Sequence, residues 1–102
     1  MKRRVVWSDF AKADIRAIID FLSDNEPEYA TFLVDNIERG GNALGTHDTS
    51  RPGRMPGTRE KSLARISYIL SYRLERTLRG EQITILRVIH AARYWPDGRW
   101  PE

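Results

Sequence analysis

The sequence predicts one α+β domain: an N-terminal strand, then a helical hairpin packed on a twisted, mainly antiparallel sheet that ends in a three-stranded meander. Apolar residues recur at spacings of three and four between residues 10 and 44, which is the period of a helix. Between residues 66 and 74 they alternate with polar residues, which is the period of a half-buried strand. A chain of 102 residues has room for one domain, so residues 1–102 are treated as one unit.

The first half of the chain is predicted to form the first strand and both helices. Residues 4–7 form the strand, and Ser8 caps a helix that runs to about Asp24. The inner stripe of this helix contains Phe10, Ala13, Ala17, Ile18, Phe21 and Leu22, with Ile15 and Ile19 beside it. The second helix begins at Pro27, because proline suits the first helical position. Its inner face contains Ala30, Leu33, Val34, Ile37 and Leu44, with Tyr29 and Phe32 partly outside that face.

The second half is predicted to begin with a long loop and to continue as the meander. Residues 45–57 are rich in glycine, proline, serine and threonine and should be irregular. Strands are expected near Thr58–Leu63, over Ile66–Leu74 and over Gln82–Ala91, with Gly80 in the turn before the last one. Because the last strand is apolar on both faces, we place it in the centre of the sheet.

Composition excludes several kinds of site. The chain has no cysteine, which rules out disulfides, cysteine-based zinc sites and thiol catalysis. His47 and His90 are its two histidines, and without suitably spaced partners they predict neither a metal nor any other cofactor. No stretch approaches the about 20 apolar residues of a membrane span, and no apolar segment follows the basic residues at the start. We therefore expect a cytoplasmic protein.

Charge is distributed unevenly along the chain. Residues 1–50 carry 6 Lys/Arg and 9 Asp/Glu, a net charge of −3, whereas residues 51–102 carry 11 and 5, a net charge of +6. The second half is therefore the candidate surface for nucleic acid or for an acidic partner. The alternative is a solvated, arginine-rich sheet face without a binding role.

Three segments, in a fixed order, resemble a known family. They are Gly53-Arg54-Met55-Pro56-Gly57-Thr58-Arg59-Glu60, Tyr68-Ile69-Leu70-Ser71-Tyr72-Arg73 and Ile83-Thr84-Ile85-Leu86-Arg87-Val88-Ile89-His90. With the Asn25-Glu26-Pro27-Glu28 break between the helices, they resemble the RelE/ParE superfamily of type II toxin–antitoxin toxins over about residues 5–96. The resemblance implies a toxin that a cognate antitoxin neutralises, and it favours a ParE-like plasmid stabilisation protein.

Members of this superfamily act in two ways. ParE-type members poison DNA gyrase and need no catalytic set, and we favour this activity, which would make the chain no enzyme. RelE-type members cut mRNA on the ribosome without a metal. A nuclease would use Arg87, His90 and Tyr94, with supporting charge from Arg59, Lys61 and Arg65. A non-toxic protein-binding module of the same fold is a further alternative.

One geometric requirement bears on the nuclease. Arg87 and His90 differ by three positions, so they point to opposite faces of a regular strand. A bulge near His90 or Ala91 would be needed to bring both side chains into one site.

The resemblance also implies a ParD-like antitoxin whose C-terminal segment folds on the toxin. Apolar residues beside the helix stripes, and arginines of the basic half, are the candidate contacts: Ile15, Ile19, Tyr29, Phe32, Arg54, Arg59 and Arg73. The alternative is that the loop at 45–57 covers the apolar ones.

Overall fold

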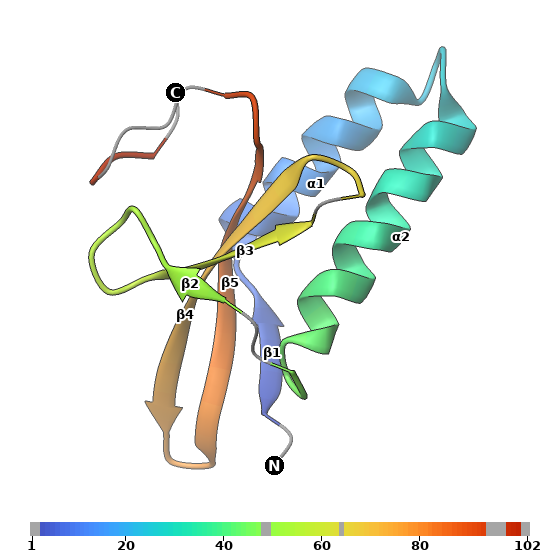
Figure 1. The fold of residues 1–102 in the computed structure, drawn as a ribbon. Coiled ribbons are helices and arrows are strands. Elements are labelled where there is room, and N and C mark those ends of the chain that lie inside the picture. Colours follow the sequence, from blue (N-terminus) through green and yellow to red (C-terminus); the bar gives the residue numbers. More distant parts are fainter. Residues whose placement is uncertain (1–2, 48–49, 64, 94–97, 101–102) are drawn as a thin grey trace.

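The computed structural model describes residues 3–47, 50–63, 65–93 and 98–100, in which two helices lie on one side of a five-stranded sheet (Figure 1). In chain order the elements are β1 (Arg4–Trp7), α1 (Asp9–Leu22), α2 (Pro27–Ala43), β2 (Arg51–Pro52), β3 (Arg59–Leu63), β4 (Tyr68–Thr77) and β5 (Gly80–His90). The predicted α+β class is confirmed, and so are the first strand, both helices and the meander.

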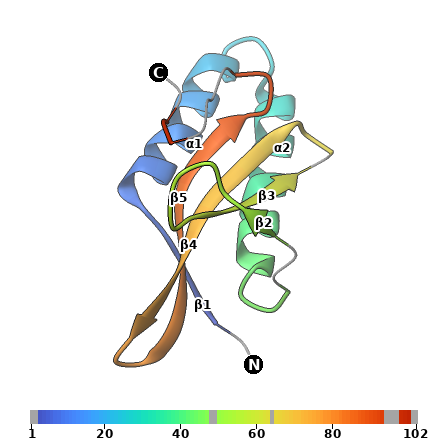
Figure 2. The same cartoon turned by 60° about the vertical axis from the view of Figure 1, so that its left-hand side comes forward.

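The sheet has the strand order β1-β5-β4-β3-β2 (Figure 2). β1 runs parallel to β5, and every other neighbouring pair is antiparallel. The central position of β5, between β1 and β4, is the one predicted from its two apolar faces. The prediction of an irregular segment at 45–57 was wrong at Arg51 and Pro52, which pair with Glu60 and Arg59 as the edge strand β2.

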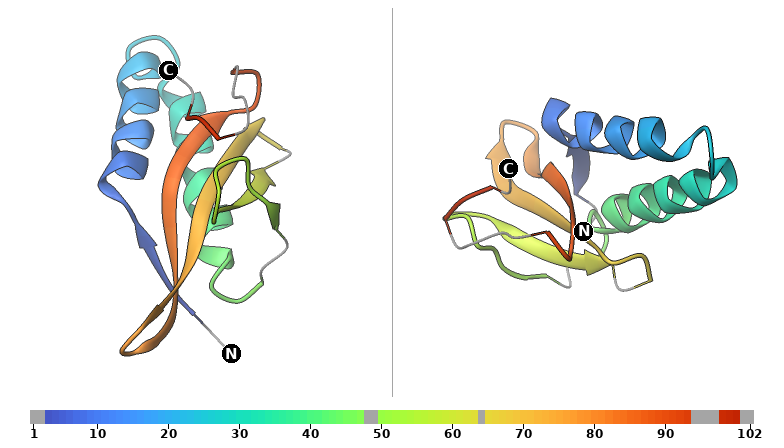
Figure 3. Two further views of the ribbon diagram at one scale, coloured as in Figure 1. Left: turned by 90° about the vertical axis from the view of Figure 1, so that its left-hand side faces the viewer. Right: turned by 90° about the horizontal axis from the view of Figure 1, so that it is seen from above.

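Both helices cover the same face of the sheet (Figure 3). Burial of apolar surface between the two layers is the main force that joins them. The buried residues of this core are Ala11, Leu33, Ile37, Leu44, Ile66, Leu70, Tyr72, Ile83, Ile85 and Val88.

The predicted inward face of α1 is confirmed at Ile18 and Leu22, which pack against the core, and is wrong at its other positions. Ser8 caps the helix as expected, since its Oγ accepts a hydrogen bond from the backbone N of Ala11 at 3.0 Å. Ala11 is buried, however, whereas Phe10 and Phe21 are 73% and 83% exposed. The prediction failed at Phe10 and Phe21 because a periodic pattern gives more weight to large aromatic residues than to one small alanine. Ile15 was expected beside the stripe and instead packs against the core.

The predicted inner face of α2 is confirmed at Ala30, Leu33 and Ile37, which are buried. Gly41 belongs to the same face because β1 approaches the helix closely there. A Cβ at this position would lie 2.4 Å from Cζ2 of Trp7. The packing of β1 against α2 therefore requires a residue without a side chain.

β4 near its start and β5 near its end are covered on both faces. Leu70 and Tyr72 belong to the core under the helices. Ile69 and Ile89 are buried on the second face, where Trp100 packs on them. The prediction of a half-buried strand was therefore wrong over residues 69–72, because the alternating pattern gave no sign that Trp100 packs on the second face.

Candidate functional site

Asp14 of α1 holds the edge of β5 at the point where β1 has ended. Its carboxylate accepts hydrogen bonds from Nε of Arg87 at 2.8 Å and from a terminal guanidinium nitrogen at 3.1 Å. The backbone N of Val88 donates a third hydrogen bond, at 2.8 Å. A two-bonded arginine–carboxylate pair is among the strongest polar contacts in proteins. Arg87 is thus held in place by the protein itself.

A bulge in β5 sets the direction of the residues that follow it. Ser71 of β4 lies opposite Arg87, whereas the next residue, Tyr72, lies opposite Ile85. Leu86 is therefore the extra residue, and the alternation of side chains between the two faces changes there.

Arg87 and His90 lie on opposite faces of the sheet, as predicted for a regular strand, because the pairing between them is unbroken. The Arg87 side chain starts on the face away from the helices, but its guanidinium reaches Asp14 of α1 at the edge of β5, with its carbon 5.7 Å from the ring centre of Trp100. The bulge that a shared site would need near His90 or Ala91 lies before Arg87 instead. Tyr94 lies outside the described residues.

The basic residues predicted to support a nuclease do not join Arg87 either. Arg59 and Lys61 lie opposite Tyr72 and Leu70, so their side chains leave the sheet on the helix side, the face opposite Arg87. Arg65 is exposed in the turn after β3. The side chain of Arg87 therefore starts on the opposite face of the sheet from those of His90, Arg59 and Lys61, and its guanidinium is paired with Asp14.

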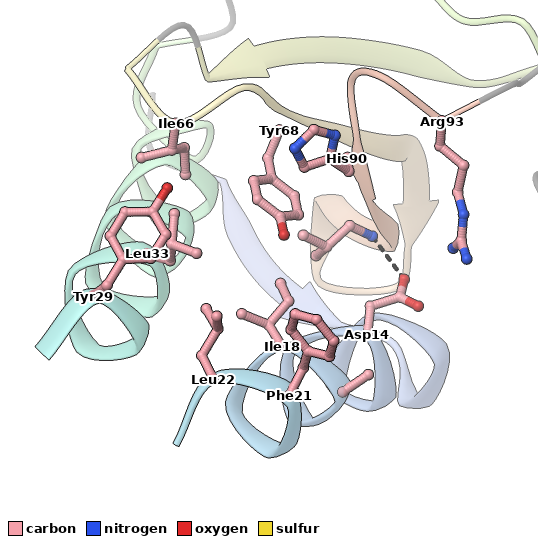
Figure 4. Close-up of a pocket in the computed structure, with 12 residues that line it drawn as sticks. Asp14, Ile18, Phe21, Leu22, Tyr29, Leu33, Ile66, Tyr68, His90 and Arg93 are labelled. Atoms are coloured by element: carbon pink, nitrogen blue, oxygen red, sulfur yellow. Dashed lines mark hydrogen bonds between the residues drawn. The ribbon is translucent and has the colours of Figure 1, made fainter. Parts of the chain in front are cut away.

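A pocket of about 410 Å³ opens between the helical hairpin and the ends of β4 and β5 (Figure 4). Its lining includes Phe21, Leu22, Tyr29, Ile66, Tyr68 and His90. The Tyr68 hydroxyl points into it. Burial raises the pKa of Tyr68 above its ordinary value of 10.0, and the neighbouring Tyr29 adds to the rise.

His90 is part of the wall of this pocket. Its ring meets the ring of Tyr68 edge-on, with 5.1 Å between the ring centres. Its Nδ1 accepts a hydrogen bond from the backbone N of Ala92 at 3.1 Å. The ring is therefore held by contacts on two sides, in a pocket whose lining also includes Asp14 and Arg93.

Glu60 has a structural role that sequence reasoning missed. Its side chain is 1% exposed, and one oxygen accepts a hydrogen bond from Arg51 at 3.2 Å. The other oxygen accepts one from the backbone N of Arg54 at 2.8 Å, with Nε of Arg54 at 3.7 Å. The carboxylate thus ties the loop before β3 to the sheet. The Arg-Glu pair of the quoted motif was the signal that could have found it.

The predicted antitoxin contacts on the hairpin include an exposed aromatic pair. Tyr29 and Phe32 are 48% and 46% exposed, and their rings stack with 6.2 Å between centres. Ile19 lines a separate groove between the helices, with Ala30 and Val34. The described part of the loop at 45–57 turns toward Glu60, so it does not cover the aromatic pair.

The other predicted antitoxin contacts are dispersed. Ile15 packs against the core. Arg54 contacts Glu60, and Nε of Arg59 donates a hydrogen bond to Oγ of Ser50 at 2.7 Å. Arg73 is exposed on β4. The arginines and the aromatic pair therefore do not form one continuous surface.

Among the described residues, no group of three histidine, aspartate or glutamate side chains is placed to hold a metal ion. Neither helix of that part of the chain is long and apolar enough to cross a membrane.

Solved structures share the arrangement of these elements. A structure of the chromosomal ParDE toxin–antitoxin system from P. aeruginosa matches with a TM-score of 0.75 and 28% identity, over 87% of this chain and 96% of that chain. The toxin–antitoxin complex RelBE2 from Mycobacterium tuberculosis matches with a TM-score of 0.59 and 22% identity, over 88% and 92% of the two chains, which shows a common fold.

Sequence comparison assigns the family. The protein Y4kP of Sinorhizobium fredii, named as a candidate toxin, is 34% identical over 97 residues, which cover 94% of this chain and 96% of that protein. Residues 5–95 match the family model described as the ParE toxin of the type II toxin–antitoxin system parDE. The chain therefore belongs to the ParE toxin family of type II toxin–antitoxin systems.

Proposed function

We propose that this toxin arrests growth by acting on DNA gyrase through surface contacts, without cutting RNA, and that an antitoxin silences it in the cytoplasm. The pairing of Arg87 with Asp14, together with the opposite directions of Arg87 and His90 on β5, carries the proposal. RNA cleavage needs a base, an acid and cations around one phosphate. Arg87 is already paired with Asp14, and the described basic residues of β3 leave the sheet on the opposite face. A gyrase poison needs a protein surface and no such assembly.

The test compares the two activities on one preparation. The purified toxin is added to a gyrase supercoiling assay and, in parallel, to ribosomes translating a defined mRNA. We expect loss of supercoiling and intact mRNA. His90→Ala and Tyr94→Phe should both still inhibit gyrase and arrest growth, provided that circular dichroism shows them folded. Ribosome-dependent cleavage that either substitution abolishes would contradict the proposal.

The exposed aromatic pair supports a site for the antitoxin on the hairpin. Tyr29 lines the pocket and stacks on Phe32, so the two rings extend the apolar lining of the pocket to the outside. An amphipathic segment of a ParD-like antitoxin could insert apolar side chains here, in the manner of a helix in a groove. Large aromatic residues at the centre of an interface carry much of its binding energy.

A matched pair of variants tests this site. Truncation of a central aromatic residue costs about 2 kcal/mol, so Tyr29→Ala with Phe32→Ala should weaken antitoxin binding at least about 30-fold. Phe10→Ala is the control, because Phe10 is 73% exposed and is not part of the pocket lining. Calorimetry with the antitoxin measures both. Equal affinities for the double variant and the control would place the antitoxin elsewhere.

A further inference from the structure

The β4–β5 hairpin extends past its neighbours as a two-stranded ribbon (Figures 1 and 3). The last pairing of β4 with β3 is at Tyr72, and β1 begins beside Gln82 of β5. Among the described strands, β4 has no neighbour on its outer side beyond Tyr72, and the last two pairs, Arg76 with Glu81 and Thr77 with Gly80, have no third strand on either side. The ribbon therefore presents its tip to solvent at the end of the molecule away from the pocket.

Hydrogen bonds hold the tip of the ribbon in one shape. Thr77 donates through Oγ1 to the backbone O of Gly80 at 2.8 Å and accepts from the backbone N of Arg79 at 3.1 Å. Gly80 has a φ of +108°, which suits glycine. Leu78 lies at this tip with its side chain fully exposed. The leucine contributes nothing to the core, so any contact it makes lies outside the chain.

Positive charge follows the ribbon to this tip. Three of its arginines are exposed and have no ion-pair partner in the described part of the chain: Arg73, Arg76 and Arg79. Of the two acidic residues nearby, Glu75 is half-buried, and Glu81 is paired with Arg3 at 3.0 Å. Arg73 and Arg76 differ by three positions, so they leave the ribbon on opposite faces. The hairpin thus has an apolar tip and exposed arginines on both of its faces, with Arg73 at the level where β1 still flanks β5.

We propose that this ribbon binds duplex DNA, with the three arginines on phosphates and Leu78 as an apolar wedge in the minor groove. Apolar side chains of minor-groove proteins insert between base steps and kink the duplex. Phosphates line both walls of a groove, which matches cations on both faces of the ribbon. An acidic protein surface would attract the arginines but would not require them on both faces. This binding goes beyond the proposed action on gyrase and does not depend on it.

The first test measures the salt dependence of binding to a fluorescently labelled 20-base-pair duplex. Three phosphate contacts predict a slope of log affinity against log salt of about −2.7, and one contact predicts about −0.9. The full toxin should give the first slope, and Arg76→Ser with Arg79→Ser should give the second. The control is Arg16→Ser with Arg39→Ser, which removes the same charge from exposed positions on the two helices. Identical slopes for the ribbon variant and the control would overturn the proposal.

The second test measures whether Leu78 acts as a wedge that bends the duplex. A duplex labelled at both ends reports bending as increased energy transfer, and the toxin should increase it. Leu78→Ser should keep the salt slope of the parent protein and lose the bend, because it leaves every arginine in place. A duplex that stays straight with the parent protein would overturn the role of Leu78.

A third measurement distinguishes the proposed DNA binding by the ribbon from the proposed action on gyrase. The arginine and leucine variants are added to the supercoiling assay beside the direct DNA titrations. If the parent protein binds no DNA while the ribbon variants lose gyrase inhibition, the tip contacts protein and the DNA proposal is wrong. If the parent protein binds and bends DNA but leaves supercoiling unchanged, the ribbon proposal stands and the proposed action on gyrase fails.

Discussion

The contact between Asp14 and β5 predicts that substitutions of Asp14 lower the stability, and that alanine lowers it more than asparagine. Asp14→Ala removes two hydrogen bonds to Arg87 and one to the backbone of Val88. A hydrogen bond to a charged group contributes about 1.5–3 kcal/mol, and a buried N–H without a partner costs about 1–3 kcal/mol. Both paired side chains remain partly solvated, at 19% and 18% exposure, so the low end applies. We expect the free energy of unfolding to fall by about 3 kcal/mol.

Asp14→Asn removes the charge of the side chain but can keep its hydrogen bond to the backbone of β5. The amide oxygen can still accept from Val88, so the loss should be about 1–1.5 kcal/mol. Urea denaturation followed by circular dichroism measures both variants. With a denaturant slope of about 1.5 kcal/mol per molar urea, the midpoint should fall by about 2 M for alanine and by under about 1 M for asparagine.

A double-mutant cycle with Arg87→Met checks the assignment to this one pair. Two residues in a direct polar contact should show a coupling energy of at least about 0.5 kcal/mol. Equal losses for the alanine and asparagine variants, together with additive effects in the cycle, would refute the claim that this carboxylate anchors β5.

Three further predictions follow from other contacts. Gly41→Ala should lower the free energy of unfolding by about 1–3 kcal/mol, since overpacking outweighs the better helix propensity of alanine. The new methyl group would lie 2.4 Å from the ring of Trp7. Gly40→Ala is the control: its methyl group meets only the flexible end of a leucine side chain, so its effect should be near zero in the same urea titration. Glu60→Gln removes a carboxylate charge that is 1% exposed and paired with arginines, and should lower the free energy of unfolding by about 1.5–3 kcal/mol. It should also speed trypsin cleavage of the loop before β3. Unchanged cleavage would count against the role of the carboxylate. Because the pKa of Tyr68 is raised in the folded state, its contribution to stability should be complete below pH 10.0 and be lost as the pH rises through the folded pKa. Tyr68→Phe should therefore remove part of the loss of stability that thermal melts show at alkaline pH. An identical alkaline loss in the variant and the parent protein would contradict this.

The order of the elements could be predicted because each one has a clear apolar period or a turn residue at its end. The inward face of α1 could not, because it depends on how closely the helix approaches β5. A small residue such as Ala11 allows close packing, and a periodic pattern gives more weight to Phe10 and Phe21. The apolar pattern also placed Ile15 beside the inward face, although its side chain is large enough to reach the core from there.

The candidate site could be predicted in part. The opposite directions of Arg87 and His90 followed from strand geometry, whereas the bulge at Leu86 could not be seen, because an extra apolar residue looks like its neighbours. The partner of Arg87 was equally hidden, since Asp14 lies 73 positions away in the chain. Ion pairs over such separations depend on the packing of α1 against β5, which no local pattern encodes.

The two outermost strands of the sheet, β1 and β2, leave little backbone open for another chain to pair with. β1 has four residues, and just before it Arg3 donates its backbone N–H to the carbonyl of Gly45 at 2.7 Å. On the other border, β2 has two residues, one of which is Pro52, with no N–H to donate. Short borders of this kind oppose growth of the sheet from one molecule to the next. Strand-to-strand pairing of two copies through β1 or β2 is therefore disfavoured.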